Sequence, residues 1–151
     1  ARELAGEMNS AALTVRAIAD GQEAVAGADN LCTLTSSTTP VLLGVWVGQR
    51  NHVNLVGSSA PTPVETDAAL VLKSRFIADH REHVLAHGAE FLRAKQAGLV
   101  NDSHVVAEIG EVLAGTRPGR QDADQVTVYK SLGHAVQDLA AVSWLHERNK
   151  S

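Results

Sequence analysis

Short apolar runs alternate with longer amphipathic stretches along most of the chain. Short runs rich in Val, Leu and Ile are typical of strands, whereas apolar positions three and four residues apart indicate helices. The runs that predict strands are 13–18, 29–35, 52–57, 75–79 and 126–132. The stretches that predict helical segments are 1–9, 21–28, 64–74, 80–97, 103–115 and 133–148, and 40–47 is a short amphipathic segment. This alternation predicts an α/β domain with a mainly parallel sheet.

Some of these elements carry more specific expectations. The run 29–35 is nearly all apolar, so we expect a strand buried on both faces, with Cys32 as a small core residue. In 64–74 the acidic residues fall in the first helical turn, where the helix dipole favours them. In 103–115 we expect one helix, with Ser103 as its N-cap and Gly115 at its end.

Composition narrows the class of protein. The chain has 151 residues, of which 44% are hydrophobic and only 3% aromatic, so one domain with an aliphatic core is expected. A net charge of -4 without a basic cluster gives no argument for a nucleic-acid partner. No apolar run is long enough to predict a membrane span. The single cysteine cannot form an internal disulfide, and the cytoplasm is the default compartment.

Three polar clusters follow expected strands, at Thr35–Thr39, Gly57–Ser59 and Lys130–Gly133. In open α/β sheets, ligands bind at the carboxyl ends of the strands. Small polar residues are also what turns are made of, so each cluster alone is equally well explained by turn chemistry. Three clusters at the same edge of one sheet favour a shared ligand.

Other candidate sites are weaker. The spacing of His80, His83 and His87 places them on one helix face, as metal ligands could be, but a solvated face is the simpler interpretation and we expect no metal. Glu108 and Glu111 are most simply surface acids. The chain contains no Ser-His-Asp order, CxxC pair, P-loop or GxGxxG fingerprint.

Three motifs in order give the chain a specific resemblance: "GADNLCTLTSSTTPVL", "HVNLVGSSAPTPVETD" and "VTVYKSLGHAVQDLA", the last two joined by "EIGEVLAGTRPGR". With these motifs the sequence resembles the ornithine cyclodeaminase/mu-crystallin family over essentially its whole length. The resemblance implies a Rossmann domain for NAD(H) or NADP(H), with a second domain, built mostly from the N-terminal part of the chain, that binds substrate and forms the dimer. It also implies an imino or amino acid as the small-molecule substrate.

The same motif match implies which residues would face the cofactor. Thr35 and Ser36 would line the dinucleotide. The nicotinamide end would lie near Val56, Gly57, Ser58, Ser131 and Leu132. We expect NAD or NADP as the cofactor, with NADPH slightly preferred.

Ser59 discriminates among the activities of the family. Cyclodeaminase and alanine dehydrogenase carry a catalytic aspartate in a "VGxD" segment, where this chain has "VGSS". A serine there resembles mu-crystallin and the pyrroline-carboxylate reductases, so no catalytic residue is assigned. A deaminase needs a base to take a proton from an amine, whereas a ketimine is easily protonated from solvent. We therefore expect reduction of a cyclic ketimine such as 1-pyrroline-2-carboxylate, with ornithine cyclodeamination and an inactive, oligomerising fragment as the alternatives.

The chain also departs from the family pattern. Gln49-Arg50 stands where Pro-Gly is usual, and Val64 stands where an Arg usually precedes the Glu. We expect 1–132 to be a partial Rossmann domain lacking its first βαβ unit, and 133–151 to be a C-terminal helix that in the family packs on the absent N-terminal domain. The expected strand 29–35 would then be an open edge, filled by 13–18, by a second copy in a homodimer, or by a missing N-terminal half.

Overall fold

The computed structural model describes residues 1–150 and contains a five-stranded sheet in which every pair of neighbours is parallel, in the order β1-β2-β5-β3-β4. The strands are β1 (Asn30–Thr33), β2 (His52–Leu55), β3 (Arg75–Ala78), β4 (Val105–Glu108) and β5 (Thr127–Lys130). The expected α/β class with a parallel sheet is confirmed. Because all strands run the same way, their carboxyl ends lie at one edge of the sheet.

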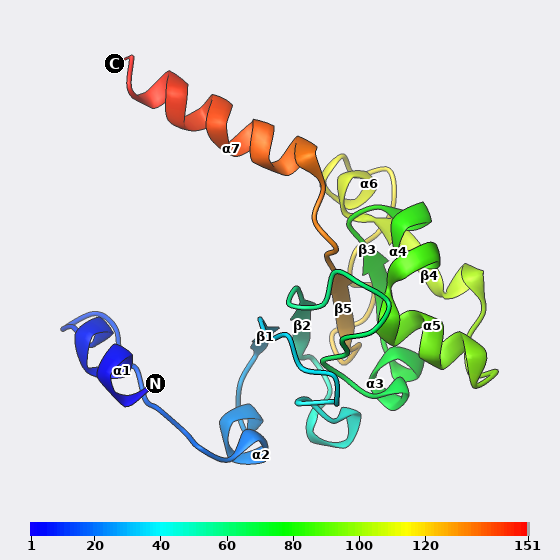
Figure 1. Cartoon of the computed structure of the whole chain (residues 1–151), viewed down its shortest axis with the longest axis horizontal. Coiled ribbons are helices and arrows are strands. Elements are labelled where there is room, and N and C mark those ends of the chain that lie inside the picture. The colour runs from blue at the N-terminus through cyan, green and yellow to red at the C-terminus, as the bar shows by residue number, and fades with distance from the viewer. Residues whose placement is uncertain (151) are drawn as a thin grey trace.

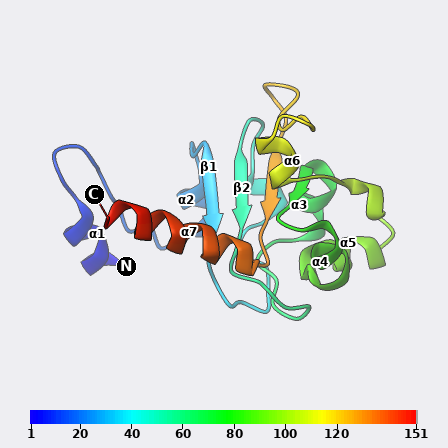
Figure 2. The same cartoon turned by 90° about the horizontal axis from the view of Figure 1, so that it is seen from above.

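The helices are α1 (Arg2–Met8), α2 (Gly21–Val25), α3 (Ala68–Lys73), α4 (Arg81–His87), α5 (Ala89–Gln96), α6 (Ile109–Leu113) and α7 (Ala135–Arg148), with two 3-10 turns, η1 (Gly44–Trp46) and η2 (Asp102–His104). In both Figure 1 and Figure 2, α3, α4 and α5 lie together on one side of the molecule. Helices α1 and α2 lie at the opposite side, beyond β1.

The core is aliphatic, as the composition predicts. Its buried members come mainly from the strands and from α3, α4 and α5, and include Val53, Leu55, Leu70, Val71 and Val128. Phe76 of β3 and Phe91 of α5 meet in the middle, with their ring centroids 6.0 Å apart. Each such buried side chain contributes about 1.5–3 kcal/mol relative to an exposed one, so this pair helps to hold α5 against β3.

The expected strand 13–18 is wrong. These residues are irregular and mostly exposed, and they pair with no strand. The backbone groups of Val15 are bonded to the Asn9 side chain, which accepts from Val15 N at 2.7 Å and donates to Val15 O at 2.9 Å. A local side chain therefore satisfies groups that a neighbouring strand would otherwise pair.

The expected single helix 103–115 is also wrong. Its first half contains β4, in which Val105 and Ala107 are buried and alternate with half-buried residues. Glu108 and Glu111 are not merely surface acids, because Glu111 Oε2 accepts from Glu108 N at 2.8 Å where α6 begins. Gly115, with φ 71°, ends the helical segment as expected.

Two other helices start or stop differently from the expectation. The segment 64–74 becomes helical only at Ala68, because the Asp67 carboxylate caps the helix by accepting from Leu70 N at 3.1 Å. Glu65 therefore lies outside the helix and is fully buried. The expected helix 80–97 is interrupted at Gly88, which separates α4 from α5.

Strand β1 is an edge strand, as expected, but it is not buried on both faces. Leu31 and Thr33 are buried, whereas Asn30 and Cys32 are exposed. The expectation that Cys32 is a core residue is therefore wrong. The apolar run predicts a strand with both faces covered, but the alternating burial of β1 is typical of a strand with one covered face.

Helix α7 projects away from the sheet in Figure 1. It has no buried residue among Ala135–Arg148. Its apolar side chains are between 53% and 65% exposed at Val136, Leu139, Val142, Trp144 and Leu145. None of the helices in the part of the chain that the structure describes is long and apolar enough to cross a membrane.

Candidate functional site

The three polar segments singled out in the sequence lie at one edge of the sheet. They follow β1, β2 and β5, which are consecutive neighbours in the sheet. Their last residues are in register, with Thr33 opposite Leu55 and Leu55 opposite Lys130. Figure 2 shows the loops after β1 and β2 on the same side as the start of α7. The prediction that these segments share one edge is confirmed.

The candidate cofactor residues differ in exposure. The side chains of Thr35, Ser36 and Val56 are exposed, and so is Ser59. Gly57 and Leu132 are half-buried, whereas Ser58 and Ser131 are buried. The Ser58 hydroxyl donates to Pro63 O within its own loop. The most exposed polar groups at this edge are therefore those of Thr35 and Ser36, in the segment after β1, whereas Ser58 and Ser131 face inward.

A buried carboxylate joins the first two segments. Glu65 Oε1 accepts from Thr35 N at 2.6 Å, and Glu65 Oε2 accepts from Thr33 Oγ1 at 2.7 Å and from Gly57 N at 2.8 Å. Hydrogen bonds to an ionised carboxylate are about twice as strong as neutral ones. Glu65 thus connects the end of β1 to the end of β2 from below the surface.

A second buried group supports the same edge from β5. The Lys130 ammonium is fully buried, donates to Ser58 O at 2.6 Å and lies 3.1 Å from Glu90 Oε2. Glu90 Oε2 makes no hydrogen bond. Lys130 therefore compensates the negative charge of Glu90 but does not donate a hydrogen bond to this oxygen. Glu90 Oε1 accepts from Glu65 N at 3.0 Å. The ion pair therefore connects α5, β5 and the two loops held by Glu65.

Asp79 fixes the third segment. Its Oδ2 accepts from Leu132 N at 2.7 Å and from Gly133 N at 2.9 Å, and lies 3.4 Å from Ser131 Oγ. Its Oδ1 accepts from His80 N at 2.7 Å. The chain that leaves β5 toward α7 is thereby attached to the end of β3.

The imidazoles form a group beside this third segment. The ring centroids of His80 and His83 are 4.9 Å apart, and His134 stacks on His80 at 5.5 Å. Among residues 1–150, no set of three His, Cys, Asp or Glu side chains has a geometry that could hold a metal ion.

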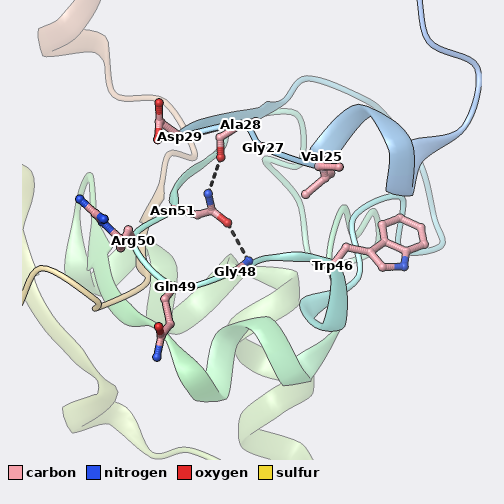
Figure 3. A pocket seen from close by; sticks show the side chains of 10 residues that line it. Val25, Gly27, Ala28, Asp29, Trp46, Gly48, Gln49, Arg50 and Asn51 are labelled. Atoms are coloured by element: carbon pink, nitrogen blue, oxygen red, sulfur yellow. Dashed lines mark hydrogen bonds between the residues drawn. The ribbon is translucent and has the colours of Figure 1, made fainter.

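A cavity of about 410 Å³ lies at the opposite end of the strands, between the turns that precede β1 and β2. Figure 3 shows Asn51 at its centre, bonded to Ala28 O and to Gly48 N. Arg50 lies on its rim with φ 71°, the only non-glycine residue among 1–150 with positive φ. This cavity does not overlap the polar edge and contains none of the candidate residues.

The sequence pattern does not reveal the buried acids that organise the edge. The sequence predicts Glu65 in the first turn of a helix and gives no signal at Glu90 or Asp79. A lysine that ends the apolar run "VTVY" was a usable signal for Lys130, because a buried ammonium requires a buried acid nearby. The identity of that acid depends on tertiary packing.

Comparison with known proteins places these features in a family. Residues 1–151 match the family model described as the ornithine cyclodeaminase/mu-crystallin family. The ketimine reductase mu-crystallin of Mus musculus is 37% identical over 133 residues, which cover 88% of this chain and 40% of that protein.

Two solved structures are similar in fold and carry bound dinucleotide. The Δ1-pyrroline-2-carboxylate reductase of Thermococcus litoralis, in complex with NADH and L-proline, has a TM-score of 0.85 and 29% identity, covering 90% of this chain and 42% of that one. The iminosuccinate reductase of Paracoccus denitrificans, in complex with NAD+, has a TM-score of 0.83 and 32% identity, covering 98% and 44%. The chain thus spans about two fifths of the length of these relatives.

Proposed function

Since the chain belongs to the ornithine cyclodeaminase/mu-crystallin family, we propose that it is the cofactor-facing portion of an NAD(P)-dependent oxidoreductase. The proposed substrate is a cyclic ketimine such as 1-pyrroline-2-carboxylate, which would be reduced to the amino acid. The observation that carries the proposal is the convergence of the segments after β1, β2 and β5 at one edge of a parallel sheet.

In this proposal the dinucleotide would contact Thr35 and Ser36 through the exposed segment after β1. Gly57 and the neighbouring backbone after β2 would face its nicotinamide end. The remaining proposed contacts are Val56, Ser58, Ser131 and Leu132. The buried Ser58 and Ser131 would contribute backbone groups rather than hydroxyls, because their side chains face inward. The bound cofactor would supply a hydride to the carbon of the C=N bond.

Ser59 favours ketimine reduction over ornithine cyclodeamination. It is exposed in the loop after β2, and a hydroxyl cannot serve as the base that an amine-oxidising deaminase needs. Replacing it by aspartate would supply a carboxylate at this position. The cyclodeaminase remains the second candidate, and Ser59 is the feature that separates the two.

We further propose that the 151-residue chain binds dinucleotide weakly and has no activity of its own, because the sequence contains no GxGxxG phosphate-binding turn. Pyrophosphate binding would then contribute little to the affinity. An oligomerising fragment without catalysis is the corresponding non-enzyme alternative, and the open edge of β1 supports it.

The test is a titration of the isotopically labelled chain with NADH and NADPH, followed by backbone amide chemical shifts. We expect weak, saturable shifts concentrated at Thr35, Ser36, Gly57 and Leu132, and no oxidation of either cofactor in the presence of 1-pyrroline-2-carboxylate. Shifts confined to the cavity at the other end of the strands, or no shifts at all, would contradict the proposed site. Tight binding or turnover would contradict the proposed inactivity of the isolated chain.

A further inference from the structure

The Glu65 carboxylate lies buried beneath the polar edge. We propose that Glu65 is a positioning residue of the dinucleotide site, which holds the segments after β1 and β2 in the arrangement that binds the dinucleotide. This inference rests on the proposed function. Glu65 itself is fully buried, so it acts through the backbone groups that it holds.

The arrangement of donors around Glu65 requires an acceptor at both carboxylate oxygens. Oε1 receives only the Thr35 N–H, while Oε2 receives the Gly57 N–H and the Thr33 hydroxyl. An ionised carboxylate accepts at both oxygens and donates at neither. A glutamine would direct an amide N–H at either the Thr35 or the Gly57 N–H, so one of the two backbone bonds would be lost.

The two loops are in direct contact above the carboxylate. A Cβ atom added at Gly57 would lie 2.2 Å from both Thr35 N and Thr35 O, and 2.4 Å from Glu65 Oε1. Gly57 N also donates to Thr33 O at 3.2 Å, so it retains a partner when the carboxylate is removed. Thr35 N has no second acceptor of this kind among the described contacts, and it is therefore the sharper reporter of the interaction.

This contact matters for binding because Thr35 and Ser36 expose their side chains from the segment that Glu65 holds. A site whose backbone is fixed before the ligand arrives does not lose ordering free energy on binding. Lys130 adds to this by donating to Ser58 O, one residue beyond Gly57. Glu65 is nevertheless the only one of these groups that contacts both loops.

The experiment compares wild-type protein with Glu65→Gln and with Thr66→Val as a matched control. Thr66 is the next residue, is also buried, and donates to Leu42 O at 2.7 Å, seven residues beyond Thr35, without a hydrogen bond to Thr35 or Gly57. In Glu65→Gln we expect amide hydrogen exchange to become faster at Thr35 or at Gly57, whichever loses its bond to residue 65, and roughly tenfold faster if the lost bond is that of Thr35. Exchange at Val105 and Ala107 of β4 should be unchanged, and Thr66→Val should leave Thr35 at the wild-type rate.

The same three proteins are then titrated with NADH, with the amide shifts as the readout. We expect a dissociation constant roughly tenfold higher for Glu65→Gln than for the other two. If wild type responds to NADH and Glu65→Gln binds it equally well, the positioning role is overturned while the proposed function stands. If wild type shows no response, the proposed function fails. Unchanged exchange at both Thr35 and Gly57 would separately refute the interaction with Glu65.

A variant with a smaller perturbation covers the case in which Glu65→Gln does not fold. Glu65→Asp keeps a carboxylate but is one methylene shorter, so it does not reach Thr35 N and Gly57 N together. It should raise exchange at Thr35 or at Gly57, and the NADH dissociation constant, by a few-fold, again without effect in β4. Wild-type values for both measurements in this variant would contradict the proposal.

Discussion

Arg50 shows how a departure from the family pattern appears in the backbone. It stands where the resemblance predicts glycine, and its φ of 71° lies in the left-handed region, which residues with a Cβ disfavour. Its N–H donates to Asp124 O at 3.2 Å, so the turn before β2 is retained despite the unfavourable residue.

We expect Arg50→Gly to stabilise the protein. Glycine removes the free-energy cost of holding a residue with a Cβ in the left-handed region. This gain should exceed the entropic cost of a more flexible unfolded chain and raise the free energy of unfolding by roughly 0.5–1 kcal/mol. Urea denaturation measures this. Arg50→Ala is the control, because it removes the guanidinium but keeps the Cβ, and it should give no such gain. Equal stabilisation by both variants would point to the side chain instead of the backbone.

His52, at the start of β2, predicts a pH dependence. Burial lowers the pKa of His52 below its usual value, and the charge of Arg120 lowers it further, against a hydrogen bond with Asn54 that raises it. The unfolded state therefore binds more protons than the folded state as pH falls below about 6.5. The contribution of neutral His52 to stability is fully present above that pH and is lost as pH decreases toward the lowered pKa.

The expected result is that His52→Asn flattens the decrease in stability between about pH 7 and pH 5. Chemical denaturation at several pH values measures it. His146→Asn, which changes an exposed histidine on α7, should keep the wild-type pH profile. A His52→Asn profile parallel to that of wild type would refute this assignment.

At the scale of elements, the Lys130–Glu90 pair fixes α5 to β5. Both side chains are fully buried, so removing one partner leaves an uncompensated charge in the core. We expect Glu90→Gln and Lys130→Met each to cost about 3 kcal/mol or more. Glu90→Gln keeps an acceptor for Glu65 N, which makes it the cleaner of the two single variants.

The double variant distinguishes a charge effect from lost packing. With both charges removed, it should be more stable than the sum of the single losses predicts, giving a favourable coupling term in a double-mutant cycle. Urea denaturation of the four proteins provides all the values. Strict additivity would show that the two residues act independently, contrary to their 3.1 Å contact.

The elements that the sequence predicted correctly are those whose pattern is decided locally. The runs that contain β1, β2, β3 and β5 are apolar and bounded by turn residues, and the sheet forms from them. The three polar segments at one edge followed from that topology. Strand β4 was missed because Val105–Glu108 is followed directly by α6, so the apolar positions of a strand and a helix merge into one helical pattern.

The failures at 13–18 and at Glu65 have a different cause. Whether 13–18 forms a strand depends on whether a neighbour is available, and the Asn9 side chain meets its backbone instead. Whether Glu65 is a helix residue or a buried acceptor depends on Asp67 capping the helix two residues later. In both cases a side chain binds a backbone N–H group and so decides the local structure. Neither apolar periodicity nor composition reveals which side chain will do this.

At the scale of the whole molecule, the chain has a well-packed centre and lightly attached ends. The core cluster lies around β2, β3 and β5, whereas α1 buries only Ala5 and α7 buries nothing. The division of the chain near residue 133 and the function of the final helix both stay proposals. Exposed apolar side chains on α7 are the largest such group on one helix in the described part of the chain.

We expect deletion of the chain after His134 to leave the sheet domain intact. Since no residue of α7 is buried, the free energy of unfolding should change by less than about 0.5 kcal/mol. The contacts that hold the start of the helix, from Asp79 to Leu132 and Gly133 and from His80 to His134, are all retained.

Light scattering on the full and shortened chains adds a second readout. If the full chain self-associates through its exposed apolar helix, the shortened chain should be monomeric at the same concentration. If deletion lowers the free energy of unfolding by more than about 1 kcal/mol, α7 contributes to the core. If both chains self-associate equally, the association does not involve α7, and the open edge of β1 is the remaining candidate surface.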